Sequence, residues 1–227
     1  MGRCDNKKEV FLVDICGTLY RSNTTFDFLA FFFHSKRWHK IVEAFRSIRV
    51  FMILNALVMK LLHKDILRIW AISHLDGFSH DELLQMAILF HKDFLLQREN
   101  KEVMDIIRVE KKRGKKIVIV SATLDVIADV VAEYLEADVV LSSKLSYNNN
   151  ICNGCLSEDL LANKLRILTE FGENPPYWGV ITDNYSDADI IMKSQNAYLV
   201  QYRGRHDRWS FVSRNKKCNI KKIMINE

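Results

Sequence analysis

Short runs of apolar residues recur along this chain, and stretches of mixed polar and apolar character separate them. The first run lies within residues 9–15, and the others are KIVIVSA, DVVLSS, YWGVITD and AYLVQ in the second half of the sequence. Short contiguous apolar runs are typical of buried strands. The pattern therefore predicts five strands.

Helices are predicted between these strands. The stretch from residue 24 to residue 98 contains no proline and indicates helical structure, with Ser79 and Glu82 forming the pattern of a capping box ahead of LLQMAILF. A charged helix ends at KKRG, where basic residues and a glycine suit a helix C-terminus. Two further helices are expected over about 124–135 and 157–171, and a short one after YWGVITD. The segment YNNNICNGC predicts a turn-rich excursion.

Strands and helices alternate after about residue 105, which predicts an α/β fold. Such alternation favours a parallel sheet with helices on both faces, and the first strand joins the same sheet. The helical block that follows the first strand is then an insert. We expect a core domain over residues 1–20 and 105–227, and a helical cap domain over residues 21–104.

Composition narrows the class of protein further. The chain has 227 residues, 48% of them apolar, with only 2 prolines, which excludes a disordered or collagen-like protein. Its net charge of +5 is mildly basic, and its 5 cysteines are odd in number. No signal peptide precedes them, so we expect reduced thiols and a cytoplasmic protein. The single CxxC has no second pair, and this pattern predicts ordinary thiols rather than a zinc site.

Polar residues close three of the predicted strands. Asp14 ends the first, Ser121 and Thr123 lie at the end of KIVIVSA, and Asp183 ends YWGVITD with Asp187 four residues later. In parallel sheets, ligands bind at the carboxyl ends of the strands. Buried carboxylates are costly without compensation, and oxygen ligands in small number suit Mg²⁺. The sequence therefore predicts a magnesium site at this edge of the sheet.

Four motifs in this order resemble the haloacid dehalogenase (HAD) superfamily of phosphotransferases. They are DICGT, VIVSAT, LANKLRIL and TDNYSD, and their order and spacing agree with the superfamily over nearly the whole chain. A helical insert directly after the first motif resembles subfamily IB, which includes phosphoserine phosphatase. The pairing of TTFDFLAFFF with SATLDVI is similar to the phosphatidylglycerophosphatase C-like branch. The resemblance implies a Rossmann-like parallel sheet with a helical cap.

The resemblance also implies roles for individual residues. Asp14 would attack phosphorus and form an aspartyl-phosphate, and Lys164 would neutralise charge on Asp14 and on the phosphoryl group. Ser121 would donate a hydrogen bond to a phosphate oxygen. Thr18 and Arg21, which belong to the first motif or follow it, are the further substrate-binding candidates.

The implied Mg²⁺ ligands are Asp14, the backbone carbonyl of Cys16 and Asp183, with Asp187 in or near the coordination shell. Cys16 departs from the family pattern, in which this position holds a second aspartate that acts as general acid and base. The backbone ligand survives the change, but the carboxylate is lost. An ordinary thiol has a pKa near 8.5, and general acid–base catalysis is worth roughly 10²- to 10⁴-fold in rate.

Three interpretations of Cys16 stay open. The protein is expected to be a slow phosphatase of a small or lipid-linked phosphate monoester, or one that acts on a good leaving group. It could instead be a phosphotransferase whose covalent intermediate persists until an acceptor arrives. The third interpretation is a catalytically impaired protein that binds phosphate esters.

The insert and the C-terminal tail carry basic and aromatic residues beside apolar runs. The apolar runs FDFLAFFF and VFMILNALVM are too short to span a bilayer, and most of their residues are expected to form the core of the cap. The basic residues suit the surface of an anionic membrane, so we expect a cytoplasmic protein that can lie on the inner membrane face. No nucleic-acid recognition motif accompanies them. They are Lys36, Arg37, Trp38, His39, Lys40, Arg46 and Arg49 in the insert, and Arg203, Arg205, Arg208, Trp209, Arg214, Lys216, Lys217, Lys221 and Lys222 in the tail.

Overall fold

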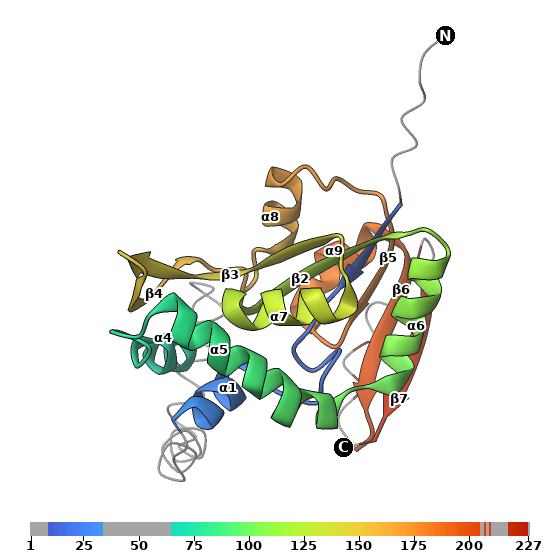
Figure 1. Ribbon diagram of the computed structural model, residues 1–227. Coiled ribbons are helices and arrows are strands. Elements are labelled where there is room, and N and C mark those ends of the chain that lie inside the picture. Colours follow the sequence, from blue (N-terminus) through green and yellow to red (C-terminus); the bar gives the residue numbers. More distant parts are fainter. Residues whose placement is uncertain (1–8, 34–64, 205–206, 208, 210–217, 227) are drawn as a thin grey trace.

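A mixed sheet forms the centre of the part of the molecule that the structure describes (Figure 1). The structure is a computed structural model that describes residues 9–33, 65–204, 207, 209 and 218–226. Within that part of the chain the strands are β1 (Val10–Val13), β2 (Lys116–Leu124), β3 (Val139–Asn148), β4 (Ile151–Glu158), β5 (Tyr177–Thr182), β6 (Ser194–Tyr202) and β7 (Asn219–Ile225).

The strand order is β4-β3-β2-β1-β5-β6-β7, with β1 in the centre. Every pair is parallel except β3 and β4, which are antiparallel. The predicted α/β fold with a parallel sheet is confirmed, with the antiparallel β3–β4 pair as the difference from the prediction. Because β1 pairs with both β2 and β5, the polar residues at or just after the carboxyl ends of these three strands come together at one edge of the sheet.

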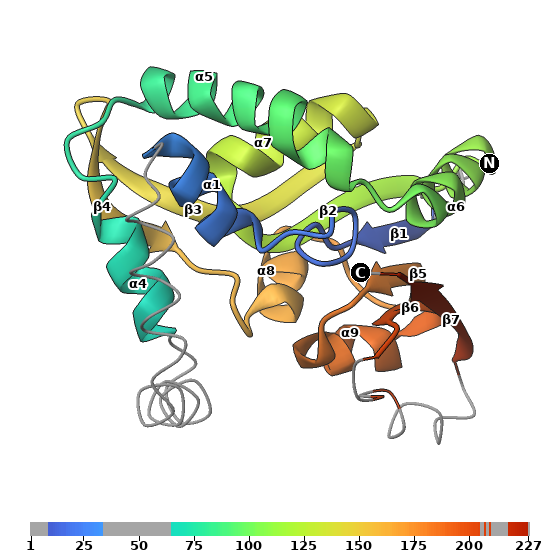
Figure 2. The same cartoon turned by 90° about the horizontal axis from the view of Figure 1, so that it is seen from below.

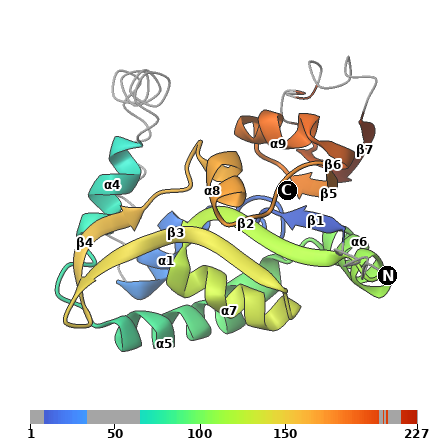
Figure 3. The ribbon, with the colours of Figure 1, turned by 90° about the horizontal axis from the view of Figure 1, so that it is seen from above.

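Helices cover both faces of the sheet (Figures 2 and 3). Figure 2 shows α5, α6 and α7 on one face and α8 and α9 on the other. The helical elements are α1 (Thr24–Phe32), α4 (Ile66–Ser73), α5 (His80–Phe90), the π-helix η1 (His91–Leu95), the 3-10 helix η2 (Leu96–Arg98), α6 (Lys101–Lys112), α7 (Asp125–Leu135), α8 (Lys164–Glu170), the 3-10 helix η3 (Tyr185–Asp187) and α9 (Ala188–Met192).

The central strand contributes to a hydrophobic core on each face. Phe11 and Val13 pack in the cluster that includes α6 and α7, whereas Val10 and Leu12 pack in the cluster that includes α8 and α9. Successive side chains of a strand point to opposite faces, so a strand covered on both sides is apolar throughout. All four residues are buried, and this explains the contiguous apolar run in the sequence.

Most of the described insert after β1 is helical, with turns and isolated bridges at residues 74–79 and 99–100. Ser79 and Glu82 form the predicted capping box, in which the Glu82 backbone N–H donates to Ser79 Oγ at 3.2 Å and the Ser79 N–H donates to the Glu82 carboxylate at 2.8 Å. Apolar residues of α1, α4 and α5 belong to the same hydrophobic cluster as α7. The boundaries that would separate a cap domain from a core domain stay a prediction.

The segment around residues 147–171 differs from the prediction. Asn149 and Asn150 both have positive φ, which suits a tight two-residue hairpin turn, and β3 and β4 extend on either side of it. Only those two residues form the turn of the expected excursion. β4 alternates exposed and buried residues to Glu158, so the predicted helix begins at Lys164 rather than at residue 157.

The tail contains a strand that the sequence pattern did not reveal. β7 pairs with β6 in parallel, and Lys222 in β7 forms an ion pair with Asp207 at 2.6 Å. Trp209 is 1% exposed and donates to the Val200 carbonyl at 3.2 Å, so the expectation of a membrane contact at this residue is wrong. The Trp209 indole is buried in the protein and therefore cannot contact a lipid surface.

The rest of the expected basic surface is only partly described. The insert residues 36–49 lie outside the described part of the chain, as do Arg205, Arg208, Arg214, Lys216 and Lys217. Among the described residues, no helix is both long enough and apolar enough to cross a membrane. The cytoplasmic location and the contact with an inner membrane face stay predictions.

Candidate active site

Asp14 follows β1 directly and is 3% exposed. Its backbone N–H donates to the Ile181 carbonyl of β5 at 3.1 Å, which fixes the end of β1 against the neighbouring strand. The chain then turns at Gly17, whose φ is +70°. A Cβ at Gly17 would lie 2.2 Å from Asp183 Oδ2, so only glycine allows this loop to approach the Asp183 carboxylate.

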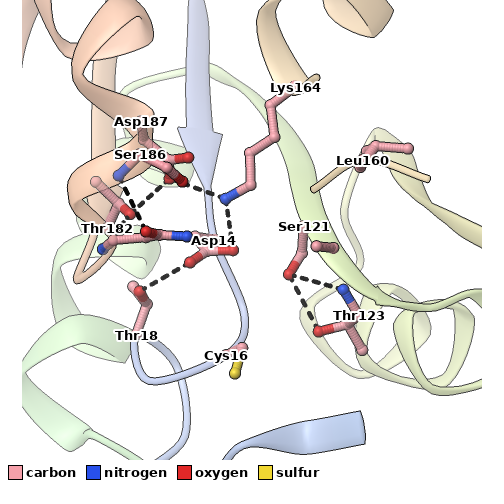
Figure 4. Close-up of polar contacts among 12 residues, drawn as sticks. Asp14, Cys16, Thr18, Ser121, Thr123, Leu160, Lys164, Thr182, Ser186 and Asp187 are labelled. Atoms are coloured by element: carbon pink, nitrogen blue, oxygen red, sulfur yellow. Dashed lines mark hydrogen bonds and ion pairs between the residues drawn. The ribbon is translucent and has the colours of Figure 1, made fainter. Parts of the chain in front are cut away.

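Three carboxylates and one ammonium group converge next to this loop, and Figure 4 shows the Lys164 side chain reaching Asp14 and Asp187. Lys164 Nζ lies 2.9 Å from Asp14 Oδ1 and 2.8 Å from Asp187 Oδ2, and the Thr182 hydroxyl donates to the same Asp187 oxygen at 2.7 Å. Asp183 is connected to this cluster by the Thr18 hydroxyl group, which lies within hydrogen-bond distance of both Asp183 and Asp14. The structure therefore brings together the strand ends of β1 and β5 and the first residue of α8.

Thr18 lies between two carboxylates and is fully buried. Its hydroxyl oxygen lies 3.1 Å from Asp183 Oδ1 and 3.4 Å from Asp14 Oδ2, and it accepts the Asp183 backbone N–H at 2.8 Å. These contacts orient Asp14 and Asp183 relative to each other. A direct contact between Thr18 and a substrate stays a prediction.

Burial and mutual repulsion shape the charges of the cluster. Burial and the nearby charge of Asp14 raise the pKa of Asp183 from an ordinary 3.8 to about 7. Burial also raises the pKa of Asp187, although the ammonium group of Lys164 opposes this effect. For Lys164, burial alone would lower the pKa, but the carboxylates of Asp14 and Asp187 raise it above its ordinary value, so the side chain is charged at neutral pH.

Hydroxyl groups from two elements meet opposite the carboxylates. The oxygens of Ser121 and Thr123 lie 3.1 Å apart at the end of β2, and Thr123 Oγ1 lies 2.8 Å from Thr24 Oγ1 at the start of α1. All three residues are buried, yet they line a common cavity. Such groups can donate hydrogen bonds to the oxygens of a phosphate.

A cavity of about 210 Å³ separates the hydroxyl groups from the carboxylates. Asp14, Cys16, Lys164 and Asp183 therefore reach the same space as Ser121. The remaining lining residues come from the start of α1, from α4 and the residue before it, from the end of β2, and from the segments before α8 and after β5. They are Asn23, Thr24, Thr25, Phe26, Asp65, Arg68, Ala122, Thr123, Leu161 and Asn184.

Cys16 lines this cavity with a half-buried thiol. Its Sγ donates to the Ser22 carbonyl at 3.3 Å, and the thiol also interacts with the backbone and hydroxyl groups of Thr24. Burial, followed by the charges of Asp14 and Asp183, raises the pKa of the Cys16 thiol to about 12. The side chain is therefore a neutral thiol at physiological pH, where the family pattern has an ionisable carboxylate.

Two arginines differ from the expectation drawn from the sequence. Arg21 is exposed, its backbone N–H donates to the Arg98 carbonyl at 2.8 Å, and its side chain does not line the cavity. Its contact with a substrate stays a prediction. Arg68 does line the cavity and was missed. One feature of the sequence could have identified Arg68. It is the one charged residue in the apolar segment ILRIWAIS, and it lies on the same buried helix face as Leu67 and Ala71.

The charge balance of the cluster fits a divalent cation. Three carboxylates face one ammonium group, which leaves two negative charges at one buried site when all four groups are ionised. In the described residues no group of three His, Cys, Asp or Glu side chains is arranged to hold a metal ion. The residues would suit Mg²⁺, which takes one or two carboxylates and completes its shell with waters and substrate oxygens.

The haloacid dehalogenase-like hydrolase family model matches residues 11–190. This match spans most of the chain, and the protein therefore belongs to that family. No curated protein matches the sequence.

Several solved structures share the fold. A protein of unknown function from Bordetella pertussis Tohama I is 12% identical, with a TM-score of 0.65 over 94% of this chain and 97% of that one. The phospho-aspartyl intermediate analogue of phosphoserine phosphatase is 16% identical, with a TM-score of 0.57 over 96% and 94% of the two chains. Cytosolic 5′-nucleotidase IIIB bound to cytidine is 12% identical, with a TM-score of 0.61 over 96% and 79%.

Proposed function

We propose that this protein is a Mg²⁺-dependent phosphatase that hydrolyses a phosphate monoester through an aspartyl-phosphate on Asp14. The observation that carries the proposal is the buried cluster of Asp14, Asp183, Asp187 and Lys164 beside a cavity that Ser121 also lines. The likeness to a phospho-aspartyl analogue of phosphoserine phosphatase supports it.

One group of residues in the site would bind the metal ion, and another would bind the substrate. Asp14, the backbone carbonyl of Cys16 and Asp183 would hold Mg²⁺, with Asp187 close to the shell. When bound, the ion neutralises charge on the phosphoryl oxygens. Ser121 donates a hydrogen bond to one phosphate oxygen from the opposite wall of the cavity.

The first step forms a bond between a carboxylate oxygen of Asp14 and phosphorus. The bond between phosphorus and the ester oxygen breaks, and that oxygen takes up a proton from the Cys16 thiol or from water as it leaves. Lys164, which is 2.9 Å from Asp14, keeps its positive charge beside the new acyl phosphate. Its two carboxylate partners hold the ammonium group in place, so no rearrangement is needed at the moment of transfer.

The second step returns Asp14 to its starting state. Water attacks phosphorus and gives up a proton to solvent water, the bond from phosphorus to Asp14 breaks, and inorganic phosphate leaves. Cys16 stands where the family has the acid and base for both steps. A neutral thiol gives up a proton less readily than a carboxylic acid, so we expect alkyl phosphates to react slowly and aryl phosphates to react faster.

The substrate that we propose is a phosphorylated small molecule or a lipid-linked phosphate. The family and the cavity of about 210 Å³ support a phosphate ester of modest size at the reacting end. A phosphotransferase is the second candidate, because the lack of a base at Cys16 would slow water attack and prolong the covalent intermediate. A protein that binds phosphate esters without turnover is the third.

The test is a phosphate-ester screen with and without Mg²⁺, on wild type, on Asp14→Asn and on Asp105→Asn as an exposed control. We expect metal-dependent release of phosphate that Asp14→Asn abolishes and Asp105→Asn leaves unchanged. Fluoroberyllate should bind wild type as a mimic of the aspartyl-phosphate. Turnover that survives Asp14→Asn would show that Asp14 is not the nucleophile, and binding without any turnover would favour the third candidate.

A further inference from the structure

Arg68 connects three separate elements next to the cavity. It lies in the first turn of α4 and is 6% exposed. Its Nη1 donates to Asp159 Oδ1 at 2.7 Å and its Nη2 donates to the Ala122 carbonyl at 2.6 Å, while its backbone N–H is capped by Asp65 at 3.0 Å. Both ends of the guanidinium fork are therefore bonded to protein oxygens.

The hydrogen bond from Arg68 to the Ala122 carbonyl holds the end of β2 that carries the proposed phosphate-binding hydroxyl groups. Ala122 lies between Ser121 and Thr123, the two hydroxyl residues of this wall. The β2–β3 pairing shifts register between Ser121 and Leu124, so Ala122 lies at an irregularity of the ladder. Arg68 donates a hydrogen bond to the Ala122 carbonyl at this irregularity, which holds the backbone next to Ser121 in place.

The bond to Asp159 acts on the loop that leads to Lys164. The same Asp159 oxygen accepts the Ser143 hydroxyl at 3.1 Å and the Leu161 backbone N–H at 3.0 Å. The Asn163 side chain closes the loop by donating to the carbonyls of Asp159 and Leu161, at 3.2 Å each. Lys164 follows Asn163 directly and is the first residue of α8. The hydrogen bonds of Asp159 and Asn163 therefore determine where α8 and the Lys164 side chain begin.

We propose that Arg68 is a positioning residue that aligns Ser121 and Lys164 across the cavity through Ala122 and Asp159. The inference rests on the proposed function, because the aligned groups are those that would contact the phosphoryl group. Lysine could not replace it, since one ammonium group cannot present two parallel donors to acceptors on different elements. An insert helix thus takes part in assembling the catalytic edge of the core sheet.

The kinetic test compares Arg68→Met, Arg68→Lys and Asp159→Asn with wild type on p-nitrophenyl phosphate and on an alkyl phosphate. Each variant should lower kcat by about 10- to 100-fold, the range expected when catalytic groups are misplaced by about 1 Å, with little change in KM. The Arg68→Met/Asp159→Asn double variant should be no slower than the slower single variant. Arg108→Met removes an exposed ion pair to Asp105 and is the matched control.

A second measurement does not depend on turnover. Amide hydrogen exchange at Leu160 and Leu161, whose N–H groups bond to Ser143 and Asp159, should be at least about 10-fold faster in Arg68→Met and in Asp159→Asn. Exchange in α6 should stay the same. If Arg68→Met does not fold, the same exchange measurement is made on Arg68→Lys, which keeps the positive charge and most of the aliphatic side chain.

The outcomes separate the possible explanations. A raised KM that depends on the leaving group, with normal Asp159→Asn kinetics, would overturn the proposal and make Arg68 a substrate contact. Unchanged exchange at Leu160 and Leu161 would also overturn it. If wild type hydrolyses no ester, the proposed function fails, and faster exchange in the variants would still support the alignment of the loop by Arg68.

Discussion

Removing the charge of Lys164 tests the electrostatic balance of the buried cluster. In Lys164→Met the side chain keeps its approximate length but loses its ammonium group. Among the described residues, Asp14 and Asp187 would then have no cation within bonding distance. With all carboxylates ionised, the net charge of the cluster would fall from −2 to −3. All three side chains of the two ion pairs are at most 5% exposed, so water can compensate very little.

The size of the effect follows from the geometry. Two unit charges about 2.9 Å apart attract by about 6 kcal/mol at an effective dielectric constant near 20, and the desolvation of the lysine offsets much of this. Removing one partner of a buried pair costs about 3–5 kcal/mol. We expect Lys164→Met to lower the free energy of unfolding by that amount in the absence of metal.

Urea denaturation in the presence of EDTA measures this difference. Arg166→Met is the matched control, because Arg166 pairs with Glu170 at 2.8 Å but both side chains are more than half exposed. Its cost should be below about 0.5 kcal/mol. Adding Asp187→Asn to Lys164→Met should restore part of the loss by removing one unpaired charge. A cost below about 1 kcal/mol for Lys164→Met would refute the electrostatic account.

Three further predictions concern the metal, the cysteine and the membrane. Mg²⁺ at about 100 times its Kd should raise the free energy of unfolding of wild type by about 2.7 kcal/mol, measured by denaturation, and Asp183→Asn should largely remove this gain. Cys16→Asp should speed hydrolysis of alkyl phosphates by roughly 10-fold or more, and of p-nitrophenyl phosphate by less, because aryl oxygens leave without a proton. A decrease in every rate would instead favour the phosphotransferase or binding interpretation. Sedimentation with anionic vesicles should show weak binding that falls as salt rises, whereas no binding at low salt would leave the basic residues near Trp38 without a membrane role.

The sequence predicted the centre of the fold because its signals there are local. A contiguous apolar run that ends in a carboxylate marks a buried strand at a ligand-binding edge, and β1 with Asp14 has this form. The same reasoning placed Asp183 after β5, and the capping box of Ser79 and Glu82 located the start of α5. These features depend on residues within a few positions of one another.

The misses depend on contacts between distant residues. The hairpin of β3 and β4 is polar on its exposed side, and its strands form because they pair across the turn at Asn149 and Asn150. β7 forms because its backbone pairs in parallel with β6 at the edge of the sheet. Arg68 belongs to the site only because Ala122, 54 residues away, and Asp159, 91 residues away, meet it in space.

The most direct test of the central claim is to identify the residue that carries the phosphoryl group during turnover. Wild type is mixed with Mg²⁺ and a phosphate ester, quenched in acid, and mapped by mass spectrometry of its peptides. We expect one acid-stable, hydroxylamine-sensitive phosphoryl group on Asp14, and none in Asp14→Asn. A phosphoryl group on another residue, or ester hydrolysis at the wild-type rate in Asp14→Asn, would contradict the account.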